Sequence, residues 1–157
     1  MRQLSDEFLE CARRRLQTES SLKQEGELRR ATSDLYFALF HGVCAALVEQ
    51  IEFDEESSTF RDVFMAIYRQ VDHGRLEKNA RRVGQNDPKF SEPFASFSKQ
   101  ITAMKNKREK ADYDPLAQLK LSTVTSDLQT VETTLDRFWS APELDRARFA
   151  VFVAVRR

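Results

Sequence analysis

The sequence predicts an all-α protein, a single-domain antiparallel bundle of five or six helices. With 157 residues the chain is long enough for one domain to bury a continuous core. Four glycines and four prolines are too few turn residues for the many short strands of a β-sandwich or barrel. Apolar residues instead recur at helical intervals along most of the chain. We therefore expect one helical domain over residues 1–157.

The N-terminal third predicts two helices. The first is expected from Leu4 to about Thr18, where apolar residues recur at steps of three and four at Leu4, Phe8, Cys11, Ala12 and Leu16. The second is expected from about Leu22 to Ile51. Between Leu35 and Val48 this second helix is apolar on nearly all sides, so it should lie at the centre of the bundle.

The middle of the chain predicts one helix and one loop. After an acidic turn, Ser57 or Ser58 is placed to cap a helix with an apolar stripe at Phe60, Val63, Phe64, Ile67, Tyr68 and Val71. Asp-His-Gly at 72–74 resembles a helix stop, because Gly74 can adopt the left-handed conformation. The polar and basic stretch 75–89 that follows is expected to be the most flexible segment.

The C-terminal part predicts two longer helices and a short one. The first begins near Ser91, carries Phe94, Phe97, Ile101 and Met104 inward, and ends near Tyr113. The second opens near Ser122 or Thr123 and has the clearest stripe, formed by Val124, Leu128, Val131, Leu135 and Phe138. Ser140 and Glu143 have the spacing of a capping box for the short helix. Its apolar tail from Phe149 must be covered by the domain's own core or by a second subunit.

Charge and cysteine content restrict the setting. The 25 basic and 25 acidic residues cancel, so a nucleic-acid partner would have to be held by a local patch. Cys11 and Cys44 lie in apolar helical patterns and are expected to be reduced core residues of a cytosolic protein. No segment resembles a signal peptide, and no run approaches the roughly 18 apolar residues of a membrane-spanning helix. We expect a soluble, cytoplasmic protein without membrane contact.

The two histidines do not indicate a metal or cofactor. Neither His41 nor His73 lies in a metal-ligand spacing, and the chain has no glycine-rich phosphate-binding loop, so we expect neither a metal nor a cofactor. His41 lies among apolar residues and is expected to be buried, with one hydrogen bond to its ring. His73 lies beside Asp72 at an expected helix end, where the helix dipole would favour a cation. Its exposure makes it the better acid-base candidate.

The segment KREKADYDP, residues 107–115, is the most informative charged feature. Arg108 and Asp112 are four residues apart and can pair on one helix face, which ends before Pro115. One interpretation is an exposed ion pair packed over Tyr113, worth about 0–1 kcal/mol. The other is that Arg108 contacts a phosphate within a basic patch widened by Lys105, Lys107 and Lys110.

Two separated motifs resemble the HEPN domain family. One prokaryotic branch of that family carries a YYAxFH-like helix, matched here by Tyr36, Phe37, Ala38, Phe40 and His41. The same branch carries an R-x-x-ADY turn, matched by Arg108, Ala111, Asp112 and Tyr113. The preceding LRRATS and the ending DRARFAVFVAVRR are also similar, so the resemblance spans about Leu28 to the C-terminus.

The resemblance implies a HEPN-like helical bundle, commonly a homodimer, often encoded beside toxin, antiphage or nucleotidyltransferase partners. Active ribonucleases of the family place a histidine four to six residues after an arginine, for proton transfer beside the phosphate-binding arginine. Here Asp112 or Tyr113 occupies the position where the histidine would follow Arg108, and Glu109 follows it directly. Asp34 is a second departure, and an Asp34–Arg108 pair would make the arginine structural.

These observations leave three functions open. The leading hypothesis is a binding or regulatory module for a nucleotide, RNA or a protein encoded nearby, without the usual ribonuclease activity. The alternative is an atypical, metal-independent endoribonuclease of a toxin–antitoxin or antiphage system, with Arg108, Asp112, Tyr113 and His73 as candidate catalytic residues. The third is an assembly domain without a ligand, marked by an interface at the apolar tail.

Overall fold

The described part of the chain is entirely helical. The computed structural model describes residues 2–17, 24–49, 58–85 and 87–154, and within them it contains seven α-helices and no strand. The all-α class is confirmed, although the helices outnumber the five or six expected. They are α1 (Arg2–Leu16), α2 (Gln24–Val48), α3 (Ser58–Gln70), α4 (His73–Gly84), α5 (Glu92–Tyr113), α6 (Leu121–Ser140) and α7 (Glu143–Ala154).

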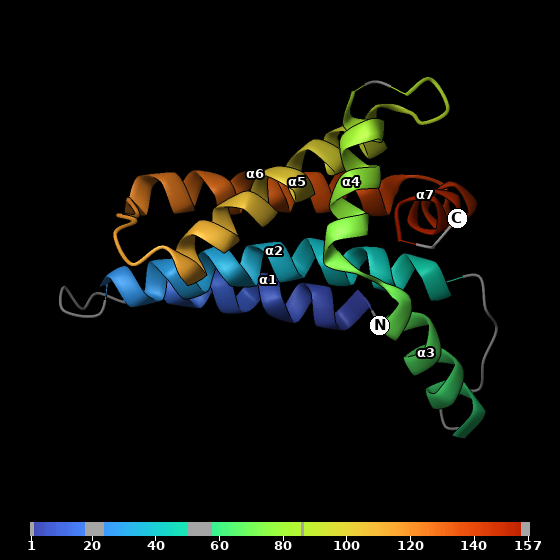
Figure 1. Cartoon of the computed structure of the whole chain (residues 1–157), viewed down its shortest axis with the longest axis horizontal. Helices are drawn as coiled ribbons and strands as arrows, with labels where there is room; N and C mark the ends of the chain where they lie inside the picture. The colour runs from blue at the N-terminus through green and yellow to red at the C-terminus, as the bar shows by residue number, and fades with distance from the viewer. Residues whose placement is uncertain (1, 18–23, 50–57, 86, 155–157) are drawn as a thin grey trace.

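Helix α2 is the centre of the bundle, as predicted. It lies antiparallel beside α1, while α5 and α6 pack on its other side and α7 lies across its C-terminal end (Figure 1). Every residue from Leu35 to Val48 except Phe37 is buried. The expected ends at Leu22 and Ile51 lie outside the described residues.

Helix α2 is also long and apolar enough, by length and composition, to cross a membrane. The expectation that no run of the chain reaches that size is therefore wrong. Within the protein, 89% of the most apolar window of α2 is buried against the other helices. Core helices of soluble proteins meet the same length and composition criteria, so this match is weak evidence for a membrane span.

Small residues allow α1 to approach α2 closely. Ser5 and Ala12 are the buried residues of α1, and the Ser5 hydroxyl donates to the Ala38 carbonyl oxygen at 2.7 Å. A Cβ atom at Gly42 would lie 3.3 Å from Leu135 Cδ2 and 3.7 Å from Ser5 Oγ. Cys44 is buried as predicted, but Cys11 is exposed, so its placement in the core was wrong. The inner face of α1 is centred on Ser5 and Ala12, and the partly buried Phe8, Leu9 and Leu16 pack against the core beside them.

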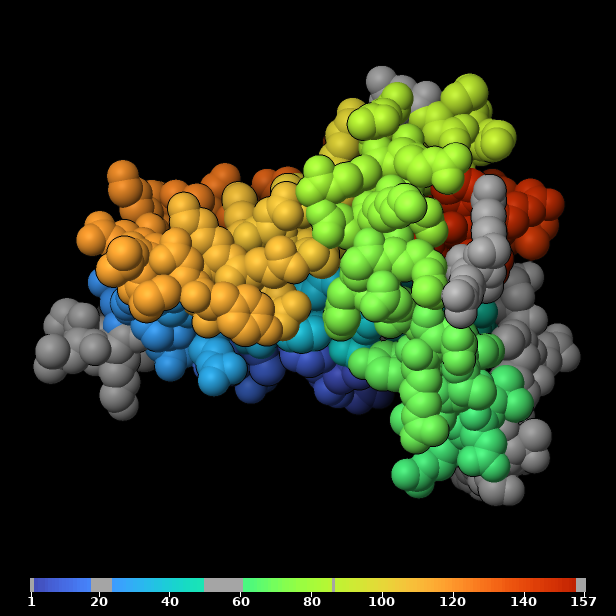
Figure 2. Space-filling view, viewed as in Figure 1, coloured from blue at the N-terminus to red at the C-terminus, as the bar shows by residue number. Residues whose placement is uncertain are grey.

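The segment 75–89 contains a helix, and the prediction of a flexible segment there was wrong. Asp72 is the N-cap of α4 and accepts a hydrogen bond from the Arg75 backbone nitrogen. Helix α3 does end just before this tripeptide, at Gln70, but Asp-His-Gly starts α4, and Gly74 lies inside that helix and does not end one. Leu76, Ala80 and Val83 form the buried stripe of α4. Helix α4 packs against α5 and α7 on the face seen in Figure 2.

Helix α3 covers much of the predicted stripe but contacts the bundle less. Val63, Phe64, Ile67 and Tyr68 are half-buried, and Val71, just beyond the helix, is buried. The side chain of Phe60 and all of Ser57 lie outside the described residues. In Figure 1, α3 projects away from the layer formed by α1 and α2.

The C-terminal helices follow the predicted stripes. All four predicted inward residues of α5 and all five of α6 are buried. The expected capping box is wrong, because Ser140 is the last residue of α6 and its hydroxyl donates to the Asp136 carbonyl oxygen. In the apolar tail, Phe149, Ala150, Val153 and Ala154 are fully buried in the protein's own core, whereas Val151 is 50% exposed.

Candidate functional site

The two motif-bearing segments meet and line an open groove. The C-terminal end of α5 lies over the N-terminal half of α2 (Figure 1). Between them is a cavity of about 510 Å³, open to solvent. It is lined from α2 by Gly26, Arg29, Arg30, Ser33 and Phe37, and from α5 by Arg108, Ala111, Asp112 and Tyr113. We call this cavity the α2–α5 groove.

Arg108 lies in the groove among aromatic rings. Its guanidinium carbon is 5.6 Å from the Tyr36 ring centre, 5.3 Å from that of Phe37 and 6.0 Å from that of Tyr113. Such contacts hold a guanidinium by cation–π attraction. The side chain is 18% exposed, so it is shielded along its length while its head reaches the groove.

The predicted Arg108–Asp112 pair is present. Arg108 Nε donates to Asp112 Oδ2 at 2.9 Å, and the Ser33 hydroxyl donates to Asp112 Oδ1 at 2.6 Å. Among the described residues, neither terminal amino group of Arg108 forms a hydrogen bond. Asp112 thus orients the guanidinium through one edge and leaves the other edge available to an anion.

Asp34 does not face Arg108, so the possible Asp34–Arg108 pair is contradicted. Its Oδ2 accepts a hydrogen bond from Arg15 Nε at 2.7 Å. Burial raises the pKa of Asp34, although the ion pair with Arg15 opposes that shift. The carboxylate therefore joins α1 to α2, and Arg108 does not serve as its partner.

Two of the three lysines predicted to widen the basic patch are paired elsewhere. Lys105 is buried between Glu77 and Glu109, with Nζ to carboxylate distances of 2.8 and 2.5 Å. Lys107 pairs with Asp127 of α6 at 2.5 Å. Lys110 is exposed but does not line the groove. The cations of the groove are instead arginines, and two of these come from α2.

His73 lies behind the groove. It is half-buried at the first turn of α4, so the expected position at the negative end of a helix was wrong. Its Nδ1 is 2.6 Å from the Tyr36 hydroxyl, whose ring lies beneath Arg108. Burial lowers the pKa of His73, and the charge of Arg108 lowers it further. The structure thus brings Arg108, Asp112 and Tyr113 together and separates His73 from them by Tyr36.

His41 is buried, as predicted, but stacked between rings. Its plane lies 2° from that of Phe8 and 6° from that of Tyr68, with ring centres 5.1 and 5.8 Å away. The expected hydrogen bond to its ring is absent among the described residues. Burial lowers the pKa of His41 to about 4. The side chain joins α1, α2 and α3 and does not reach the groove.

Arg29 also lines the groove, and its contacts were not indicated by the motifs. Its Nη1 donates to the carbonyl oxygens of Ala111 at 2.6 Å and Asp114 at 2.9 Å. Its Nη2 donates to the Ala117 carbonyl oxygen at 2.6 Å, and its Nε donates to Glu25. Only the adjacency of LRRATS to the aromatic helix marked this region in the sequence. Partners that are backbone carbonyls leave no sequence signal.

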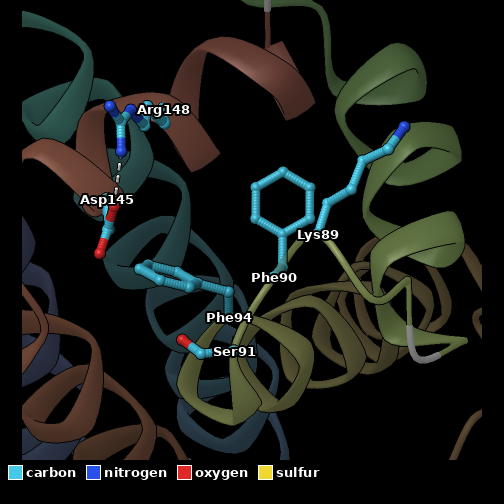
Figure 3. Close-up of a pocket in the computed structure, with 6 residues that line it drawn as sticks. All are labelled: Lys89, Phe90, Ser91, Phe94, Asp145 and Arg148. Atoms are coloured by element: carbon cyan, nitrogen blue, oxygen red, sulfur yellow. Dashed lines mark hydrogen bonds and ion pairs between the residues drawn. The ribbon is translucent and has the colours of Figure 1, made fainter.

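A second, smaller cavity lies at the start of α5 (Figure 3). Its volume is about 230 Å³, and Lys89, Phe90, Ser91, Phe94, Asp145 and Arg148 line it. Arg148 pairs with Asp145 at 3.1 Å, and Lys89 extends away from both. The phenylalanines separate these charges, so the cavity has no convergent set of polar groups.

Nothing in the described residues forms a metal site, since no group of three or more His, Cys, Asp or Glu side chains converges there. Comparison of the chain with protein-family models, with curated proteins and with solved structures gave no match. Any functional conclusion must therefore come from the geometry of the groove and the motifs that line it.

Proposed function

We propose that the α2–α5 groove binds a nucleotide or a single-stranded stretch of RNA, and that the chain is a HEPN-like binding or regulatory module. Arg108 carries this proposal, because its terminal amino groups are available in an open groove. A guanidinium with a free edge is well suited to a phosphate. Tyr113 is 73% exposed beside it and offers a face on which a base can stack.

The proposal includes the absence of the usual ribonuclease activity. No histidine lines the groove among the described residues. His73, which lies behind the groove, forms a hydrogen bond with the Tyr36 hydroxyl. Asp112 accepts hydrogen bonds from Arg108 and Ser33, so both of its carboxylate oxygens already have partners within the protein. Binding without cleavage is the outcome that these contacts favour.

Binding is tested by fluorescence anisotropy with a fluorescein-labelled, ten-nucleotide single-stranded RNA. Arg108→Ala should weaken binding about tenfold or more, since hydrogen bonds to charged groups contribute about 1.5–3 kcal/mol. Arg137→Ala is the matched control, because it removes an exposed arginine of α6 outside the groove. Equal affinity of wild type and Arg108→Ala would remove Arg108 from the site.

An atypical endoribonuclease is the second candidate. One observation favours it: the hydrogen bond between Tyr36 and His73 connects a histidine to the ring beneath Arg108. Incubation of RNA with the purified protein in EDTA distinguishes the two functions. Intact RNA supports the binding module. Cleavage that is lost in both Arg108→Ala and His73→Ala supports the enzyme.

The resemblance also implies a homodimer, and a protein encoded nearby is the other expected partner. Light scattering of the purified chain tests the first point directly. A homodimer should have twice the 18.2 kDa mass of the chain. A single-chain mass at micromolar concentration would contradict the homodimer.

A further inference from the structure

Three arginines line the α2–α5 groove, and two of them are neighbours in the sequence. Arg29 and Arg30 come from α2, and Arg108 comes from α5. Residues one apart on a helix point in different directions, so neighbours can have different roles. The contacts of Arg29 and Arg30 differ in just this way.

Arg29 is committed to the protein. Both of its terminal amino groups donate to carbonyl oxygens at the end of α5 and in the turn after it. The last carbonyls of a helix have no partner within the helix, so such donors satisfy groups that would otherwise be unpaired. Two of these carbonyls belong to Ala111 and Asp114, and Asp112 and Tyr113 lie between them in the sequence. Arg29 thereby fixes the wall of the groove that carries them.

Arg30 has no such commitment. It is exposed, and among the described residues it has neither a hydrogen bond nor an ion pair, although its charge acts on the Asp34 carboxylate one helical turn away. Gly26, Arg30, Ser33 and Phe37 follow steps of four, three and four, so they form one face of α2, and all four line the groove. A Cβ atom at Gly26 would meet nothing within 4 Å, so space is open beside Arg30 one turn away.

We propose that Arg30 is the second phosphate-binding cation of the groove, opposite Arg108, and that Arg29 is a positioning residue that shapes the groove. This inference rests on the proposed function. It assigns ligand contact to Arg30, which the motifs did not single out. It excludes ligand contact by Arg29, which has the same charge and lies one position earlier. Arg30 thus has the phosphate-binding role that was predicted for Lys105, Lys107 and Lys110.

The salt dependence of RNA binding separates the two roles. Each cation that contacts a phosphate of a single strand contributes about 0.7 to the slope of log affinity against log salt concentration. Arg30→Gln should therefore reduce the slope for the ten-nucleotide RNA by about 0.7. The melting temperature of the Arg30→Gln variant should stay close to that of the wild type. Arg137→Gln, with the same loss of charge outside the groove, should keep the wild-type slope.

Arg29 variants should behave in the opposite way. Arg29→Gln and Arg29→Lys should both lower the melting temperature, because neither side chain can donate to three separated carbonyls. At temperatures well below melting, both variants should keep the wild-type slope of log affinity against log salt concentration. If Arg29→Gln does not fold, as judged by circular dichroism, Arg29→Lys still carries the stability comparison.

The outcomes separate this inference from the proposed function. A slope that falls for Arg29→Gln and not for Arg30→Gln overturns the assignment while RNA binding stands. A slope that falls for Arg108→Gln alone leaves the proposed function in place and removes Arg30 from it. If wild type fails to bind RNA, both the proposed function and the role of Arg30 fall. The role of Arg29 is still decided by the melting temperatures.

Discussion

The stacked histidine at the centre of the aromatic cluster should make the fold sensitive to mild acid. His41 is 8% exposed, lies between the parallel rings of Phe8 and Tyr68, and has a pKa of about 4 against an ordinary 6.5. The unfolded chain therefore binds a proton at His41 more readily than the folded chain between these two values. Stability from the neutral imidazole is present above pH 6.5 and is lost as the pH falls toward 4.

The size of this effect follows from the two pKa values. Linkage gives a loss of unfolding free energy of about 2 kcal/mol at pH 5 and about 0.2 kcal/mol at pH 7. Both losses are relative to a pH at which His41 is neutral in the folded and the unfolded chain. The change between pH 7 and pH 5 attributable to His41 is thus about 1.8 kcal/mol. Most carboxylates remain ionised over this interval, since their ordinary pKa values are near 4.

Urea unfolding at pH 7 and at pH 5 measures this change. In His41→Phe and His41→Gln, the fall in unfolding free energy should shrink by about 1.8 kcal/mol relative to wild type, whatever the absolute stability of each variant. His73→Gln is the control, because burial is the larger cause of the lowered His41 pKa and the charge of His73 the smaller, so removing His73 should keep most of the His41 contribution. The reasoning is refuted if both His41 variants lose as much stability as wild type between the two pH values.

Two further predictions concern packing and helix ends. Gly42→Val should lower the unfolding free energy by about 1–3 kcal/mol, because its side chain would press on Leu135 and Ser5. Gly26→Ala should not lower it, because the space around a Cβ atom at Gly26 is open. Urea unfolding of both variants checks this. Arg146→Ala should cost about 3 kcal/mol, since buried Arg146 bonds Glu49 and the Trp139 and Ala141 carbonyls at the end of α6. Arg146→Lys should not restore thermal stability, because a lysine lacks the planar fork; equal melting temperatures of Arg146→Lys and wild type would contradict this role.

The sequence predicted helices best where large apolar residues mark the buried positions. The bounds of α5 and α6 agree with the prediction within one or two residues, because their apolar stripes have no rival pattern. Helix α4 was missed because its charged residues dominate its composition. Its stripe has only Leu76, Ala80 and Val83, and Asp72 before it was interpreted as part of a stop.

Missing α4 also led to the error at Lys105. Glu77 of α4 pairs with Lys105, so this lysine cannot widen a basic patch. The Arg108–Asp112 pair was predictable because both partners lie on one helix four residues apart. The Arg15–Asp34 pair and the Arg29 carbonyl contacts join separate helices, so only the tertiary arrangement reveals them. Cys11 was misplaced because it lies one residue, about 100° around α1, from the buried Ala12.

The central claim is that ligand contact in the α2–α5 groove is made by Arg108 and Arg30 together. Side-chain NMR of arginine Nε–H groups, recorded as the ten-nucleotide RNA is added, tests it most directly. The signals of Arg30 and Arg108 should shift in proportion to bound RNA, while those of Arg29 and Arg146 should stay in place. Shifts at Arg29 or Arg146 with none at Arg108 would contradict it.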